Sequence, residues 1–246
     1  MLKNVGKMTL NYSPNFDLQK RSKKNIKYII YHYTGMKNDK LAIEKLINFN
    51  SKVSCHYYID KDGNITQLVP DLYVAWHAGI SFWKGDKSLN NSSIGIEISN
   101  PGHEHGYKAF KKKQIKSLIK ILKILIKKYK IKKRNIVGHS DIAPLRKIDP
   151  GEKFPWKLLA NNKIGIWHQS KSYNLKKYKK IKILKKKDKI KFFKNLSKIG
   201  YCFSMKKRFF LFKIIKAFQR HYRPELINGH IDKESFIIAQ NLLKNL

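Results

Sequence analysis

Two periods of apolar residues divide the first part of the chain into expected strands and helices. Residues 27–33 form a short run of aromatic and β-branched side chains, which is typical of a buried strand. Residues 93–99 place isoleucine at every second position, so this strand is predicted to present Glu97 on the face opposite the isoleucines. Residues 56–59 and 65–69 flank an Asp-Gly pair, which predicts a β-hairpin.

Apolar spacing of three and four residues predicts helices between these strands. Residues 39–49 and 114–130 follow this pattern, and the lysines of the second segment fall on its expected solvent face. A short strand at 135–138 comes next. Because strands and helices alternate, we expect an α/β fold in which helices flank a mixed central β-sheet.

The last third of the chain has a different pattern. Residues 171–191 are dense in lysine and keep no sustained apolar period, so we interpret them as a basic linker. Residues 213–221 and 233–243 have helical spacing, with Arg-Pro and Asn-Gly breaks between them. We therefore expect a first domain at 18–165, a basic linker at 166–191 and a small all-helical domain at 192–246.

The charge of the chain is strongly positive and unevenly distributed. The 246 residues include 54 Lys+Arg and 16 Asp+Glu, a net charge of +38. Residues 108–213 hold 35 basic and 4 acidic residues, a net charge of +31, whereas residues 1–107 carry only +5. Most of the basic residues are lysine, and no nucleic-acid recognition motif accompanies them, so no specific nucleic-acid partner is expected. We interpret much of the charge as a compositional bias, with sequence-independent nucleic-acid binding as the alternative.

Cysteine content and hydropathy narrow the class of protein further. The chain has two cysteines, Cys55 and Cys202, which are too few for a disulfide framework or a four-cysteine zinc site, so free thiols are expected. No apolar run is long enough for a transmembrane segment. The N-terminal residues also lack the apolar core of a signal peptide. This favours a cytoplasmic location, with the periplasm or cell envelope as the alternative.

Two histidines and an aspartate form a candidate metal site. His32 lies at the end of one expected strand, His139 follows another, and Asp149 comes ten residues later. Two imidazoles and one carboxylate leave a fourth position open for water, as in catalytic zinc sites. Glu97 is a candidate general base, and Lys147 a candidate for stabilising an oxyanion. A histidine beside an apolar run is more often structural, so this spacing alone leaves both interpretations open.

Six ordered segments resemble one enzyme family. The segments are YHYTG (31–35), VSCHYYIDKDGNITQLVP (53–70), AWHAG (75–79), SIGIEISNPG (93–102), VGHSDIAP (137–144) and RKIDPGEKFPW (146–156). Together they are similar to the zinc-dependent N-acetylmuramoyl-L-alanine amidases of the type 2 class, in the superfamily of the peptidoglycan recognition proteins, over residues 20–160. The resemblance implies a mixed sheet, one zinc ion per chain, and peptidoglycan or muropeptides as partners.

The resemblance assigns roles to individual residues. His32, His139 and Asp149 match the zinc ligands; some relatives have cysteine in the third position. Glu97 matches the catalytic acid/base, and Lys147 matches the lysine that stabilises the transition state. The implied activity is hydrolysis of the amide bond between N-acetylmuramic acid, or its 1,6-anhydro form, and L-alanine of the stem peptide. A non-catalytic peptidoglycan-binding protein is the alternative.

Other residues near these motifs have weaker assignments. Trp76, His77 and Asn100 are candidates for substrate binding, although a structural role for His77 is equally compatible with the sequence. His56 is expected either in the core or directly behind the metal ligands. Phage-type relatives have a catalytic tyrosine where this chain has Cys55, so that role is left to the acid/base residue.

The C-terminal region carries a second resemblance. Residues 217–232 are similar to a peptidoglycan-binding module, a small three-helix bundle found behind some of these amidases. The alternative is a helical cap that only packs against the catalytic domain. Sequence leaves open whether intact wall or anhydro-muropeptides are the substrate.

Overall fold

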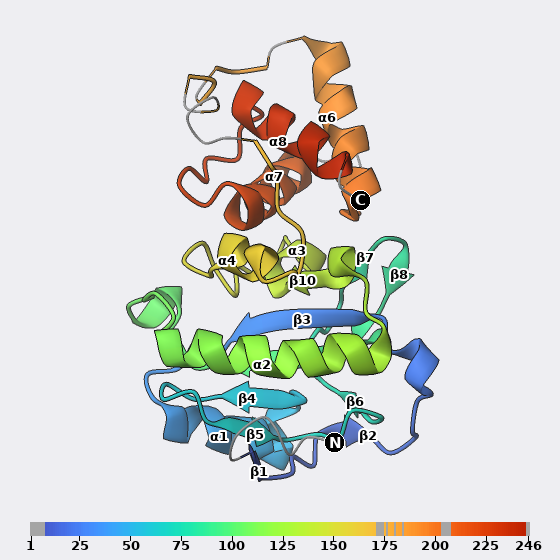
Figure 1. Cartoon of the computed structure of the whole chain (residues 1–246), viewed down its shortest axis with the longest axis vertical. Coiled ribbons are helices and arrows are strands. Elements are labelled where there is room, and N and C mark those ends of the chain that lie inside the picture. Colours follow the sequence, from blue (N-terminus) through green and yellow to red (C-terminus); the bar gives the residue numbers. More distant parts are fainter. Residues whose placement is uncertain are drawn as a thin grey trace.

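A mixed six-stranded sheet forms the centre of the first part of the chain (Figure 1). This computed structural model describes residues 8–170, 175, 177–179, 181–183, 185–202 and 208–244. Neighbouring strands run parallel except for the hairpin of residues 57–59 and 65–67, which is antiparallel as predicted. Across the sheet the order is β1 (Met8–Leu10), β5 (Ile65–Gln67), β4 (Tyr57–Ile59), β9 (Ser93–Ile98), β3 (Tyr28–Tyr33) and β10 (Ile136–Gly138).

One face of the sheet is covered by α2 (Lys112–Tyr129). Side chains alternate between the faces of a strand, so the three isoleucines of β9 and Ile29 and Tyr31 of β3 pack in the same cluster as the apolar side of α2. His32 and Glu97 occupy the alternate positions of these strands and therefore lie on the opposite face. The strand boundaries and the orientation of Glu97 confirm the prediction from the isoleucine pattern.

A second helix, α1 (Asp39–Ile47), begins where the sequence predicts it. The side chain of Asn38 accepts a hydrogen bond from the backbone N–H of Leu41 at 2.9 Å and caps the first turn. Its buried residues pack with the free thiol of Cys55, whereas the second free cysteine, Cys202, is exposed. Two short ribbons that the sequence did not predict pair β2 (Phe16–Asp17) with β6 (Val74–Ala75) and β7 (Phe82–Trp83) with β8 (Asp86–Lys87).

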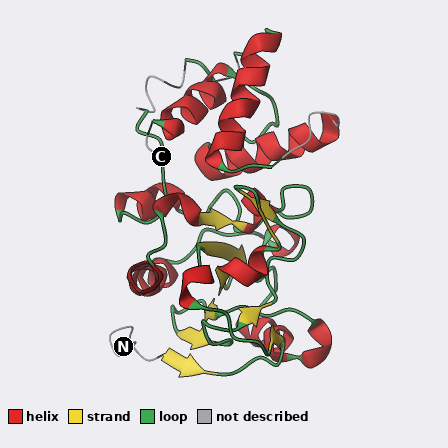
Figure 2. Ribbon diagram, turned by 90° about the vertical axis from the view of Figure 1, so that its right-hand side faces the viewer, coloured by secondary structure: helices red, strands yellow, loops and turns green. Residues whose placement is uncertain are grey.

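The C-terminal part is helical: in Figure 2 the strands lie in the half of the molecule that holds the N-terminus, together with helices, and the other half consists of helices and loops. The helix α6 (Lys186–Ile199) begins within the stretch predicted as linker, so the expected boundary at residue 192 falls inside it. The apolar pattern does not reveal the N-terminus of this helix, because the lysines of its first turn are exposed and its buried residues begin only at Phe192. Linker residues 171–174, 176, 180 and 184 lie outside the described residues. The helices of this part are α6 (Lys186–Ile199), α7 (Arg208–Tyr222) and α8 (Lys233–Leu243).

The helical part lies beyond the edge strand β10, next to α3 (His139–Ile142) and α4 (Trp156–Asn161) (Figure 1). Buried polar contacts join the two parts at Asp141 of α3. Its carboxylate accepts a hydrogen bond from the hydroxyl of Tyr201 at 2.6 Å and faces Nδ1 of His221 at 2.8 Å. The ring of His221 also stacks on Trp156, with centroids 3.6 Å apart. The helical part is therefore anchored to the helix that begins with His139.

Candidate active site

Strand register brings the predicted site residues to one edge of the sheet. On the parallel strands β3 and β9, His32 lies directly opposite Glu97. On the other side of β3, Gly138 of β10 pairs with Tyr31, so the next residue along the chain, His139, comes level with His32. Side chains from β3, from β9 and from the residue that follows β10 therefore converge at the carboxyl edge of these parallel strands.

Three side chains form a buried cluster that can hold a metal ion. One ligand atom from each of His32, His139 and Asp149 lies within 4.8 Å of the other two. Nδ1 of His32 is 2.9 Å from Nδ1 of His139 and 3.2 Å from Oδ2 of Asp149, and the last two atoms are 3.1 Å apart. The sequence prediction that these three residues meet is thus matched by the geometry.

The ligand atoms of the cluster are in protonation states that allow them to bind a cation. Burial and the adjacent His139 lower the pKa of His32 to about 4. Burial alone would raise the pKa of Asp149, but the two imidazoles hold it well below its ordinary value. Nε2 of His139 faces the carbonyl oxygen of Ala78 at 3.2 Å; because that oxygen only accepts, this contact favours the tautomer with the proton on Nε2 and a bare Nδ1. Nitrogen and carboxylate ligands of this kind suit zinc.

Glu97 and Lys147 accompany the cluster. Oε2 of Glu97 is buried and has no hydrogen-bond partner among the described residues. Burial, with a smaller effect of the nearby Asp149 charge, raises the pKa of Glu97 to about 8. Lys147 is half-buried, and within the described part of the chain its ammonium has no hydrogen bond or ion pair. Both side chains therefore remain available to a ligand.

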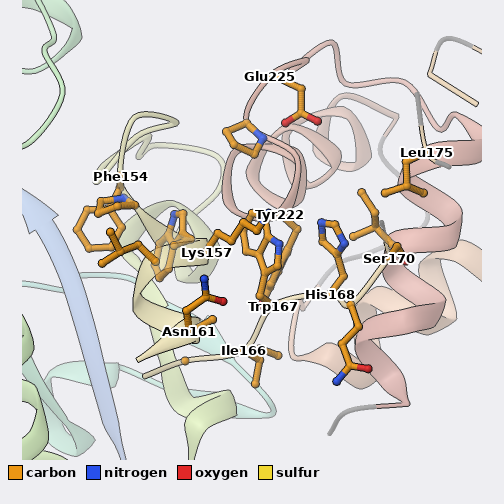
Figure 3. Close-up of a pocket in the computed structure, with 18 of the residues that line it drawn as sticks. Phe154, Lys157, Asn161, Ile166, Trp167, His168, Ser170, Leu175, Tyr222 and Glu225 are labelled. Carbon is orange, nitrogen blue, oxygen red and sulfur yellow. The ribbon is translucent and has the colours of Figure 1, made fainter. Parts of the chain in front are cut away.

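A cleft of about 400 Å³ contains this chemistry. The five predicted metal-ligating and catalytic residues line it together with Trp76 and His77. A larger cavity of about 1410 Å³ lies between residues 154–170 and the helical part, where Trp167 and Tyr222 face it (Figure 3). None of the predicted metal-ligating or catalytic residues lines this larger cavity, so the smaller cleft is the candidate active site.

The three predicted substrate-binding residues have different positions. Trp76 borders the cleft, and its Nε1 donates a hydrogen bond to Asp17 at 2.7 Å. His77 is buried, with Nδ1 3.0 Å from Nε2 of His32, and burial with the neighbouring His32 holds its pKa well below the ordinary value. Asn100 is absent from the cleft lining: its amide donates to the Lys108 carbonyl at 2.8 Å and stabilises a loop. The structure therefore does not bring Asn100 to the cleft.

The structure also shows the positions of His56 and Arg146, for which the sequence predicted no catalytic or binding role. His56 is fully buried, as expected, and its Nδ1 accepts a hydrogen bond from the backbone N–H of Gly95 at 3.0 Å. Arg146 lines the cleft and donates to the carbonyl oxygens of Ala78 and Ile80, holding their loop against the site. The only signal for Arg146 in the sequence is its position next to Lys147.

Ligand atoms that can hold a metal ion converge beside an unpaired carboxyl group at the carboxyl edge of a mixed sheet, and this arrangement suits a hydrolase. The family model for N-acetylmuramoyl-L-alanine amidase matches residues 22–152. A relative in Escherichia coli K12, the N-acetylmuramoyl-L-alanine amidase AmiD, is 38% identical over 231 residues, which span 89% of this chain and 83% of that protein. The chain therefore belongs to the N-acetylmuramoyl-L-alanine amidase family, which confirms the predicted family.

Other similarities cover the fold as well as the sequence. The 1,6-anhydro-N-acetylmuramyl-L-alanine amidase AmpD of Haemophilus influenzae is 32% identical and matches 59% of this chain and 86% of its own length. The structure of E. coli AmiD with the substrate anhydro-N-acetylmuramic acid-L-Ala-D-γ-Glu-L-Lys superposes with a TM-score of 0.80 and 34% identity, over 93% of both chains. AmpDH3 of Pseudomonas aeruginosa gives a TM-score of 0.79 at 28% identity, over 97% of this chain and 99% of its own.

These structural matches extend through the helical part and confirm the predicted fold class. Among the described residues, no helix combines the length and apolar character that crossing a membrane requires.

Proposed function

We propose that this protein uses one zinc ion to hydrolyse the amide bond between N-acetylmuramic acid, or its 1,6-anhydro form, and L-alanine of peptidoglycan stem peptides. The observation that carries the proposal is the buried cluster of His32, His139 and Asp149 beside the unpaired carboxyl oxygen of Glu97. The relatives support the choice of bond, since the matched AmiD structure contains an anhydro-muramyl peptide described as its substrate.

His32, His139 and Asp149 would hold the zinc ion. Bound zinc supplies Lewis-acid chemistry: it polarises a carbonyl group and makes water more acidic. The pKa of Glu97, raised to about 8 by burial, would be lower beside a bound cation, so its carboxylate could accept a proton near neutral pH. We assign to Glu97 the transfer of a proton from the attacking water to the leaving amine of L-alanine.

Lys147 is assigned to the developing negative charge on the scissile carbonyl oxygen. It lines the same cleft as Glu97 and has no hydrogen bond or ion pair with any described residue, so its ammonium is free to bind this oxygen. Trp76 forms a partly exposed wall of the cleft and is the predicted substrate-binding residue best placed to contact the muropeptide.

For the domains, we propose that residues 18–165 form the catalytic unit and that the helices after the linker form an associated unit. The contacts of Asp141 with Tyr201 and His221 favour a cap that packs on the catalytic unit. Wall binding by the same helices is compatible with these contacts. Binding of the inactive Glu97→Gln protein to purified sacculi, with and without excess muropeptide, measures that second role.

The proposed activity is tested with defined substrates. Zinc-loaded protein is incubated with anhydro-muropeptides and with intact sacculi, and mass spectrometry follows the release of free stem peptide beginning with L-alanine. We expect release from at least one substrate, and its loss in Glu97→Gln. Substrate binding without release would instead favour the non-catalytic alternative, and release undiminished in Glu97→Gln would refute the assigned role of this residue.

A further inference from the structure

Two adjacent residues contact both imidazoles of the proposed zinc site from behind. The side chain of His77 lies against His32, with Nδ1 of His77 3.0 Å from Nε2 of His32. The backbone carbonyl of the next residue, Ala78, lies 3.2 Å from Nε2 of His139. In each case the contact is to the nitrogen that points away from the cluster, and the other nitrogen faces Asp149.

The hydrogen bonds behind His77 fix the direction of the contact with His32. The hydroxyl of Ser93 lies 2.6 Å from the carbonyl oxygen of Leu89, which only accepts, so Ser93 donates its single proton there. Its oxygen is then the acceptor for Nε2 of His77 at 3.2 Å, and that nitrogen carries the proton of the neutral ring. Nδ1 of His77 is therefore bare, and Nε2 of His32 must donate to it.

This chain of bonds determines which nitrogen of His32 is a ligand. A neutral His32 that donates from Nε2 has a bare Nδ1, and the same holds for His139 through Ala78. The two bare nitrogens lie 2.9 Å apart beside the carboxylate of Asp149, so three electron-pair donors converge without a proton between them. A cation is the group that such a set accepts.

The surroundings hold residues 77 and 78 in place. The side-chain oxygen of Asn90 accepts hydrogen bonds from both backbone N–H groups, at 3.1 Å for His77 and 2.7 Å for Ala78. Gly95 of β9 leaves the space for the imidazole, because a Cβ atom there would lie 2.4 Å from Cγ of His77. A glycine in the middle of a central strand thus has a packing reason.

We infer that His77 and Ala78, held by Asn90, Ser93 and Gly95, are the positioning element for both imidazole ligands, and that His77 sets the tautomer of His32 rather than binding substrate. This inference rests on the proposed zinc site. Groups that orient metal-binding imidazoles typically change metal affinity about 10–100-fold when they are removed.

Two substitutions of His77 separate positioning from general packing. The side-chain oxygen of His77→Asn can occupy the place of Nδ1 and accept from His32, whereas the amide of His77→Gln replaces Nε2 and leaves His32 without its acceptor. Zinc affinity of each folded protein is measured by competition with a chromophoric chelator, and folding by circular dichroism. We expect His77→Gln to bind zinc about 10–100-fold more weakly than wild type and His77→Asn to recover most of that loss.

Three results of the zinc-affinity measurements would contradict the proposed role of His77 or the proposed zinc site. Equal zinc affinity of folded His77→Gln and wild type would overturn it and leave the proposed zinc site intact. Weakening of the same size in both variants would also contradict it, since packing alone would then explain the loss. A wild-type chain that binds no zinc would refute the site itself. If His77→Gln fails to fold, zinc affinity is measured for Asn90→Ala, which removes the acceptor for the backbone N–H groups of residues 77 and 78 without touching either imidazole. Asn90→Asp keeps the accepting oxygen and is the matched control.

Discussion

The buried carboxyl group of Glu97 should make the metal-free protein less stable than a variant without it. The pKa of Glu97 is raised from 4.5 to about 8, so the folded chain holds this proton more tightly than the unfolded chain. Stability contributed by the protonated group is complete below pH 4.5 and is lost as the pH rises through 8. Glu97→Gln keeps the shape without the ionisation, so its advantage over wild type grows across this window.

The size of the effect follows from the shift in pKa. Each pKa unit corresponds to about 1.4 kcal/mol, which gives Glu97→Gln an advantage of up to about 4 kcal/mol at pH 7.5 and almost none near pH 4.5. The free energy of unfolding is measured by urea denaturation in the presence of a chelator at several pH values. The matched control is Glu104→Gln, which makes the same change at an exposed position and should show no such trend.

Two results would refute this reasoning. The difference in free energy of unfolding between Glu97→Gln and wild type could stay constant from pH 4.5 to 8. That result would show that folding does not raise the pKa of the carboxyl group. The opposite sign at pH 7.5 would show that the ionised group is stabilised by the fold. Added zinc should narrow the difference, because the positive charge favours the carboxylate.

Three other substitutions and treatments have defined outcomes. Lys147→Met should lower kcat about 10²–10³-fold with little change in KM, measured with muropeptides, because the lost charge acts mainly on the transition state; a change in KM alone would contradict this. Zinc at 100 times its Kd should stabilise the wild type by about 2.7 kcal/mol in thermal denaturation and leave Asp149→Asn nearly unchanged. Tyr201→Phe should cost about 1–3 kcal/mol in urea denaturation, because the buried carboxylate of Asp141 loses a donor at 2.6 Å; an unchanged midpoint would argue against anchoring there.

Periodicity in the sequence predicted the parts of the fold that carry buried apolar residues. The isoleucines of β9 fixed the face on which Glu97 lies, and the register with β3 then placed it opposite His32. The start of α6 could not be predicted, because its first turn is lysine-rich and exposed and therefore has no apolar pattern. The ribbons β2–β6 and β7–β8 are two residues per strand, too short for any period.

The metal ligands could be predicted because they lie in recognisable motifs. The role of His77 could not, because it depends on hydrogen bonds between residues that are distant in the sequence. The metal cluster was a candidate from the positions of His32 and His139 after expected strands, the family resemblance assigned its ligands, and the geometry brings the three members together. The contact between His77 and His32 joins residues 45 positions apart. It depends on the hydroxyl of Ser93 and on the absence of a side chain at Gly95, and neither residue type by itself predicts such a role. Asn100 lies in one of the motifs, but its side chain bonds to the backbone of its own loop. The direction of a loop side chain cannot be predicted from its position in a motif.

The location of the metal ion tests the account most directly. Crystals grown with zinc are measured with X-rays at energies on both sides of the zinc absorption edge, and an anomalous difference map is calculated. We predict one strong peak about 2.0–2.2 Å from Nδ1 of His32, Nδ1 of His139 and a carboxylate oxygen of Asp149. A peak held instead by other side chains, or by the Nε2 atoms of the two imidazoles, would contradict the account.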